Sequence, residues 1–226
     1  MKEKMLIYHG SDHIVKVPQY GYGKKYNDYG MGFYCTENED LAKEWAVDRE
    51  RNGYSNAYEL NLADLEVLNL NEGDLTILHW ITILLKNRQF DIQTDFGQEA
   101  IEYLSNHYSL NTMDADVIIG YRADDSYFSY ASDFLNNIIS LETLERAMKL
   151  GELGEQVVLK SKKAFDNIRF VDATEVRATE WYAAKSVRDS RARMKYKEIK
   201  QQPRKKGALY LMEIIDQEAG TDDSRI

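Results

Sequence analysis

Short strand segments alternate with helical segments along this 226-residue chain. Runs of apolar residues, some of them alternating with polar ones, predict strands at 5–10, 57–62, 65–70, 117–119, 157–159 and 168–170. Apolar residues at helical spacing, with capping residues before them, predict helices at 37–51, 75–87, 98–107, 127–137 and 141–150. Thr36, followed by Glu39, predicts a capping box for the first of these helices. Most of the strands are too short for a doubly wound sheet, so the pattern favours an α+β fold.

A change of charge near residue 171 predicts two parts. Residues 1–171 carry 17 Lys and Arg against 28 Asp and Glu, whereas residues 172–207 carry 11 against 5. The first part contains the predicted strands, and an apolar fraction of 43% for the whole chain is enough for a core. The second part, 172–226, is predicted to be a basic helical extension. Its helix over 175–198 ends before Pro203, and a short strand over 208–214 follows.

The basic segment leaves two interpretations open. A positive segment on an acidic body could contact nucleic acid or an acidic partner. A charged helix that only faces solvent is the more common explanation. Charge alone does not decide between them.

The sequence also predicts location and metal content. Residues 1–7 lack the apolar run of a signal peptide, and the most apolar segment, 75–85, is too short to span a bilayer, so we expect a cytoplasmic protein that does not bind membranes. The lone cysteine, Cys35, excludes an intramolecular disulfide. The chain has four histidines, and they do not form a cluster with cysteine at metal-ligand spacing, so no metal site is expected.

Two fragments contain residues suited to holding a flat ligand. The first, 8–11, reads Tyr-His-Gly-Ser at the end of a strand, where His9 offers a polar ring beside the bare backbone of Gly10. The second, 32–36, reads Gly-Phe-Tyr-Cys-Thr, and the helix after it places Trp45 eleven positions beyond Tyr34. Such aromatic residues are often ordinary core residues, so the order and spacing of the fragments carry the functional interpretation.

Together the fragments resemble the ADP-ribosyltransferase superfamily of the His-Tyr-Glu type, shared by the diphtheria toxin catalytic domain and the poly-ADP-ribose polymerases. In that pattern a Tyr-His-Gly-Ser/Thr strand precedes Gly-Phe-Tyr-x-Thr and then a helix with a second aromatic residue. The resemblance implies a split β-sheet core with surrounding helices and NAD as the substrate.

More narrowly, residues 5–171 are similar to the bacterial family called domain of unknown function 3990. The shared features are the Tyr-His-Gly-Ser start, the Gly-Phe-Tyr-x-Thr block, and a late Gln-Val-Val-Leu-Lys-Ser strand followed by Lys-Ala-Phe. Members often sit beside a small partner gene, which implies a toxin and a small antitoxin-like partner.

The resemblance also implies roles for single residues. His9 would bond to a ribose hydroxyl and Gly10 would offer backbone groups to the nicotinamide amide, while the rings of Tyr34 and Trp45 would stack on nicotinamide. The residues expected to contact NAD are His9, Gly10, Ser11, Gly32, Phe33, Tyr34, Thr36 and Trp45.

The third catalytic residue, besides His9 and Tyr34, is either Glu155 or Gln156. The polymerase pattern places the catalytic glutamate at Glu155, whereas the bacterial family emphasises the glutamine. Adjacent strand residues face opposite sides of a sheet, so only one of the two can point into the NAD cleft. We expect Glu155, whose carboxylate could bind the ribose and stabilise a developing cation.

A further polar cluster follows the strand near 117–119. Arg122, Asp124 and Asp125 could contact the acceptor or the NAD phosphates, because loops at strand ends often carry function. Asp125 or Ser126 could equally cap the next helix.

These expectations add up to an NAD-dependent ADP-ribosyltransferase that moves single ADP-ribose units to a protein or nucleic-acid acceptor and releases nicotinamide. A role as a toxin or defence effector is implied by the resemblance alone. Two alternatives remain: a nucleotide-binding module without catalysis, and a protein that binds a partner or nucleic acid through its basic helix.

Overall fold

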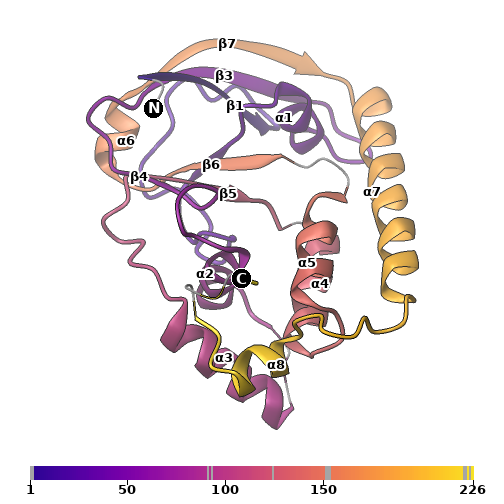
Figure 1. Ribbon diagram of the computed structural model, residues 1–226. Coiled ribbons are helices and arrows are strands. Elements are labelled where there is room, and N and C mark those ends of the chain that lie inside the picture. Colours follow the sequence, from indigo (N-terminus) through magenta and orange to yellow (C-terminus); the bar gives the residue numbers. More distant parts are fainter. Residues whose placement is uncertain are drawn as a thin grey trace.

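The computed structural model describes residues 3–90, 92, 94–123, 125–150, 154–220, 223, 225 and 226, with residues 125–127 described by their backbone alone. Two sheets and a group of helices form the body, which confirms the α+β class (Figure 1). None of the helices in these ranges is long and apolar enough to cross a membrane. They also contain no group of three or more His, Cys, Asp or Glu side chains that could hold a metal ion.

The first sheet has three antiparallel strands in the order β1 (Lys4–Ser11), β3 (Gly53–Asn61) and β7 (Ile168–Val176). The second sheet has the order β2 (Phe33–Cys35), β6 (Glu155–Leu159), β5 (Val117–Tyr121) and β4 (Val67–Asn69). Its strands are antiparallel except for the parallel pair β4 and β5.

A single bridge joins the two sheets at the end of β1. The Tyr8 N–H donates to the Thr36 carbonyl at 2.8 Å, and the Thr36 N–H donates back to Tyr8 at 3.0 Å. Thr36 is therefore part of the connection between sheets and not the cap of helix α1 (Glu39–Ala46). Asn38 caps α1 instead, because its side chain accepts from the N–H groups of Asp40 and Leu41.

The sheets enclose one apolar core, and helices cover the far face of the second sheet with another. Alternation along β6 sends Val157 and Leu159 into the first core and Val158 into the second. The covering helices are α2 (Ile77–Asn87), α3 (Asp95–His107), α4 (Asp125–Leu135) and α5 (Leu141–Met148), and the short helix α6 (Lys162–Asp166) joins β6 to β7 (Figure 1). Because both faces of β6 are covered, the strand is apolar on both sides.

The C-terminal part of the chain contains a long helix. Helix α7 (Ala178–Lys200) runs beside the body from the level of the first sheet to the level of α4 (Figure 1). It contacts α1 through an ion pair of 2.5 Å between Arg188 and Glu44, and the Tyr196 hydroxyl donates to Asp133 of α4 at 2.7 Å. Strand β7 runs through the boundary predicted at residue 171 and pairs with β3 as far as Val176.

The strand predicted over 208–214 is wrong. This segment contains helix α8 (Leu211–Asp216), which contacts α3. Its buried residues Leu211 and Ile214 are three positions apart, so they lie on one helix face. A short apolar run does not distinguish a strand from a buried helix, and packing on α3 decides the matter.

Candidate functional site

His9 lies at the end of β1, and its ring is held from the neighbouring sheet. Its Nδ1 lies 2.7 Å from the carbonyl oxygen of Tyr34, and its ring centroid is 4.3 Å from that of Phe33. Burial lowers the pKa of His9, against the smaller opposing effect of the bond to Tyr34. A carbonyl only accepts, so neutral His9 donates from Nδ1 and keeps Nε2 as an acceptor.

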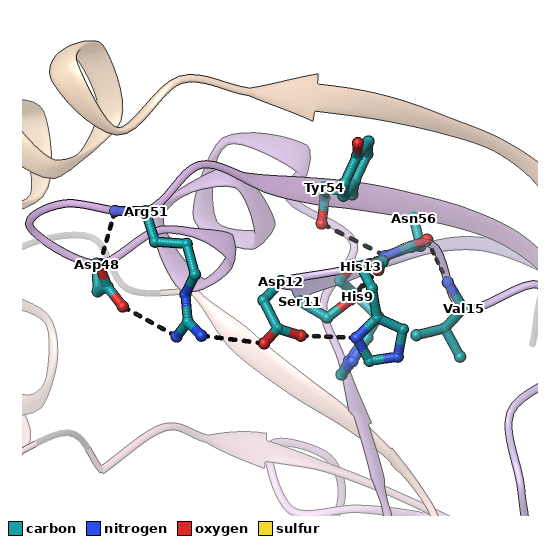
Figure 2. A network of polar contacts seen from close by, with 9 residues as sticks. All are labelled: His9, Ser11, Asp12, His13, Val15, Asp48, Arg51, Tyr54 and Asn56. Carbon is teal, nitrogen blue, oxygen red and sulfur yellow. Dashed lines mark hydrogen bonds and ion pairs between the residues drawn. The ribbon is translucent and has the colours of Figure 1, made fainter.

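A buried asparagine fixes the chain around the end of β1 (Figure 2). The Asn56 Nδ2 donates to the His9 carbonyl at 3.1 Å and to the Ser11 hydroxyl at 3.0 Å, and its Oδ1 accepts from the Val15 N–H at 2.9 Å. The Ser11 hydroxyl in turn donates to the carbonyl of His13. Ser11 therefore shapes the turn that follows His9.

An outer chain of ion pairs holds the same turn to the start of β3 (Figure 2). Asp12 accepts from His13 at 2.6 Å and pairs with Arg51 at 3.2 Å, and Arg51 also pairs with Asp48. All these groups are exposed, so each ion pair contributes little to the stability of the fold.

Gly10 lies beneath α1 and does not present an open backbone. A Cβ atom there would stand 2.0 Å from the Ala42 carbonyl oxygen and 2.7 Å from the Ala46 nitrogen. Gly32 is equally close to β6, since a Cβ would stand 2.7 Å from Val158 Cγ1. Both glycines let one segment pass close to another.

Tyr34 lines two cavities, and its hydroxyl both donates and accepts a hydrogen bond. The hydroxyl donates to the Gly30 carbonyl at 2.6 Å and accepts from the Tyr29 N–H at 3.0 Å. Burial raises the pKa of Tyr34 well above its ordinary value. The hydroxyl therefore holds the preceding turn, and the ring is the part available to a ligand.

One cavity of about 230 Å³ brings Tyr34, Trp45 and Gln156 together. Its remaining walls are Asn27, Asp28, Arg88, Arg122 and Ala123. The Arg122 guanidinium lies 4.8 Å from the centre of the Trp45 ring, as in a cation–π contact. Among the residues that line this cavity, Trp45 and Gln156 each have a buried polar atom, Nε1 and Oε1, without a hydrogen-bond partner among the described residues. Such atoms are what a polar ligand would satisfy.

A second cavity, of about 710 Å³, contains His9 and adjoins the first at Asn27 and Tyr34. Gly32, Phe33 and the loop from His13 to Lys24 provide most of its other walls. Its volume lies within the range of about 300–1,000 Å³ that is typical of small-molecule sites.

Glu155 and Gln156 face opposite sides of β6. Gln156 is 5% exposed and lines the cavity with Tyr34 and Trp45. Glu155 is exposed, accepts from Asn71 Nδ2 at 2.6 Å, and lines a separate acidic cavity with Thr36. The geometry therefore groups Gln156, and not the expected Glu155, with the two aromatic rings.

The other predicted residues are placed as follows. Arg122 lines the cavity with Trp45, while Asp124 lies outside the described residues and Asp125 begins α4 with an undescribed side chain. Cys35 is fully buried, and burial raises the pKa of its thiol.

The sequence analysis missed Asp28 and Arg88. Asp28 is 5% exposed, and its Oδ1 lies 3.4 Å from Arg88 Nη1. Burial raises the pKa of this carboxyl, opposed by a hydrogen bond from the Ala123 N–H and by the charge of Arg88. The only signal in the sequence was an aspartate within a tyrosine-rich loop.

Comparison with known protein families gives a match over most of the chain. A family model described as "Protein of unknown function (DUF3990)" matches residues 5–170. No curated protein and no solved structure matches the chain significantly. Because the matched region covers well over half of the sequence, the chain belongs to the DUF3990 family.

Proposed function

We propose that this protein is an NAD-dependent ADP-ribosyltransferase. The observation that carries the proposal is the cavity in which Tyr34, Trp45 and Gln156 meet, joined at Tyr34 to the cavity that contains His9. The resemblance to the His-Tyr-Glu enzymes implies a role in binding or catalysis for His9, Tyr34 and Trp45, and the resemblance to the bacterial family emphasises Gln156.

The two aromatic rings suit the nicotinamide end of NAD. The nicotinamide ring is flat and carries a positive charge in NAD, so it can stack on Tyr34 and Trp45 with a cation–π component. The Arg122 guanidinium, another flat cation, already lies over Trp45. We infer that NAD binding displaces Arg122 from this ring.

The polar groups suit the ribose and the amide. Neutral His9 keeps Nε2 as an acceptor for a ribose hydroxyl, and Gln156 Oε1 is a second buried acceptor. In the reaction the bond between the anomeric carbon and the nicotinamide nitrogen breaks, and its electron pair neutralises the ring. The acceptor nucleophile then bonds to that carbon and loses its proton. The sugar passes through a cationic transition state, so groups that hold its hydroxyls in place lower the barrier.

The absence of a carboxylate at position 156 favours transfer of single units over chain building. Gln156 can hold a hydroxyl but does not supply the negative charge that would activate a second sugar as nucleophile. We propose a protein or nucleic-acid acceptor, and a toxin or defence role paired with a small antitoxin-like partner.

Calorimetric titration with NAD tests the binding part of the proposal. Tyr34→Ala and Trp45→Ala should each weaken binding about fivefold or more, because a stacked ring contributes about 0.5–1.5 kcal/mol beyond its buried area. Tyr182→Ala is the control, since this aromatic residue lies on α7 and does not line the cavity. An equal loss in the control, or no binding by the wild type at millimolar NAD, would contradict the proposal.

A nucleotide-binding module without catalysis is the second candidate. It is favoured because the neutral Gln156, and not a glutamate, lines the cavity with Tyr34 and Trp45. NAD binding without nicotinamide release, tested with and without cell lysate as a source of acceptors, would support this candidate over the transferase.

The basic helix α7 has an exposed side that could bind a partner. Its side toward the body is occupied by the Arg188 and Tyr196 contacts, whereas Arg191, Lys195 and Lys197 are exposed. If these cations bind nucleic acid, the affinity should fall steeply with salt and be lost in a triple Ala variant. An affinity that is independent of salt would exclude this role.

A further inference from the structure

We propose that Asp28 is a positioning residue that orients the Gln156 side chain, so that position 156 presents a hydrogen-bond acceptor to the ligand. The catalytic importance of this orientation rests on the proposed function. The orientation itself does not, because it follows from the contacts of the two side chains.

Asp28 is held by fixed partners from separate elements. Its Oδ2 accepts from the Ala123 N–H at 2.9 Å and from Gln156 Nε2 at 3.3 Å. Its Oδ1 lies 3.4 Å from Nη1 of Arg88, the residue that follows α2. Asp28 thus joins the end of α2, the segment after β5, and strand β6. Arg88 and Arg122 are the charged groups that act on its carboxyl.

The chemistry of a carboxylate decides which end of the Gln156 amide faces it. An ionised carboxylate only accepts hydrogen bonds, so the amide must turn its Nε2 toward Asp28. The Oε1 atom then points away from Asp28. This atom is buried and has no protein partner within the described residues, and Gln156 is one of the walls of the cavity with Tyr34 and Trp45. The group that meets Oε1 must be a donor, namely a hydroxyl or an amide N–H.

Asp28 also explains why a neutral residue stands at position 156. A glutamate there would place a second carboxylate beside a buried one, and two adjacent carboxylates do not ionise together readily. Glutamine keeps an acceptor for the ligand and gains a donor for Asp28. The pair Asp28 and Gln156 therefore acts as one unit.

The orientation can be tested without any activity. In protein labelled with ¹⁵N-glutamine, the Gln156 side-chain signals are assigned from their loss in Gln156→Ala and followed as the pH is lowered. They should shift as the Asp28 carboxyl protonates, and this shift should vanish in Asp28→Asn. Gln98 is the matched control, because its Nε2 donates to the carbonyl of Ile92 at 2.7 Å, which does not titrate. Gln156 signals that do not respond to pH, or that respond equally in Asp28→Asn, would overturn the proposal.

NAD binding by variants of Asp28 and Gln156 gives a second test of the positioning role. Asp28→Asn and Gln156→Glu should each weaken NAD binding about tenfold at neutral pH, the size expected for loss of a charge-assisted hydrogen bond. The double variant Asp28→Asn with Gln156→Glu should bind NAD more tightly than Gln156→Glu alone, because it no longer places two carboxylates side by side. Gln156→Glu that binds NAD as well as the wild type would contradict the role of Asp28. Thermal melting verifies that each variant is folded, and Gln156→Glu tests the pair even if Asp28→Asn does not fold.

The two proposals fail in different ways. If the wild type neither binds NAD nor releases nicotinamide, the proposed function fails while the ¹⁵N titration still reports on Asp28. If NAD binds but the pH response of the Gln156 signals does not depend on Asp28, the positioning role fails and the proposed function stands.

Discussion

The Nδ1 atom of His9 lies 2.7 Å from the carbonyl oxygen of Tyr34, so the first motif of the sequence is bonded directly to the second. This contact joins the end of the three-stranded sheet to the edge strand of the four-stranded sheet. It also fixes the tautomer of His9, since the proton must be on Nδ1. The bridge between Tyr8 and Thr36 lies at the same junction.

The first prediction concerns the pH dependence of NAD binding. Burial lowers the pKa of His9 below its ordinary value of 6.5, so the ring stays neutral at pH 7 and for some distance below 6.5. NAD affinity should therefore be constant from pH 8 to 6.5 and fall only when pH drops through the lowered pKa. Calorimetric titration at a series of pH values measures this, with His9→Gln as the variant that lacks the titrating group. A fall in affinity that begins above pH 6.5 would contradict the neutral, buried His9.

The stability of the protein should also depend on the protonation of His9. The unfolded chain protonates its histidine near pH 6.5, before the folded chain does, so acid favours the unfolded state in this window. The free energy of unfolding should thus decrease as pH falls below 6.5, and part of the decrease should be missing in His9→Gln. Urea unfolding at pH 7.5 and pH 5.5 gives the comparison. Identical pH dependence in both proteins would count against the pKa assignment.

The second prediction separates the ring of Tyr34 from its hydroxyl. Tyr34→Phe removes the bonds to Gly30 and Tyr29 but keeps the ring, so it should cost about 1–3 kcal/mol of stability and leave NAD affinity nearly unchanged. Tyr34→Ala should lose both stability and affinity. Thermal unfolding and NAD titration on the two variants provide the test. Loss of NAD binding in a folded Tyr34→Phe would show that the hydroxyl contacts the ligand.

The third prediction concerns the close contact between β1 and α1. Gly10→Ala places a Cβ about where the Ala42 carbonyl oxygen stands, so α1 must move. We expect a loss of about 1–3 kcal/mol or more, as in other overpacked sites, together with weaker NAD binding because α1 carries Trp45. Unfolding in urea measures the first effect and titration the second. An unchanged stability would exclude the tight packing of this glycine.

The fourth prediction tests how α7 is attached. Arg188→Leu leaves Glu44 largely buried without its partner, which should cost stability toward the lower end of the range of about 3–5 kcal/mol for broken buried pairs. Burial raises the pKa of Glu44 and Arg188 opposes this, so the variant has a still higher pKa at Glu44. A carboxyl whose pKa is raised in the folded state makes the protein less stable as pH rises. The loss of unfolding free energy in Arg188→Leu should therefore be smaller at pH 5 than at pH 8.

Arg191→Leu on the same helix is the matched control for that experiment, because Arg191 is exposed. Thermal unfolding of both variants at the two pH values should show a deficit in Arg188→Leu alone. A larger deficit at pH 5 than at pH 8 would contradict the role given to Glu44.

The sequence predicts the α+β class and the nature of most elements because the apolar periodicity of these segments is strong. It fails where packing decides between two local structures. Leu211 and Ile214 belong to a helix because α3 covers them, and nothing within the segment says so. Likewise Asn38 and not Thr36 caps α1, because Thr36 is already bonded to β1.

Some features of the candidate site are likewise predictable from the sequence, and others are not. The pairing of Tyr34 with Trp45 in one cavity follows from the family-like spacing of the two residues. The choice between Glu155 and Gln156 does not follow from the sequence, because Val157, Val158 and Leu159 are buried on both faces of β6 and the strand has no polar side. Asp28 comes from an irregular loop whose path is fixed by Lys160 and Asn87, both distant in sequence.

Nicotinamide release from NAD by the purified protein, with cell lysate as a source of acceptors, tests the central claim most directly. The wild type and the Gln156→Ala and Glu155→Ala variants are compared at equal folded concentration. We predict that the wild type and Glu155→Ala release nicotinamide at similar rates, while Gln156→Ala is slower by at least tenfold. Loss of release in Glu155→Ala with full release in Gln156→Ala would contradict the assignment of the cavity formed by Tyr34, Trp45 and Gln156 as the site of the reaction.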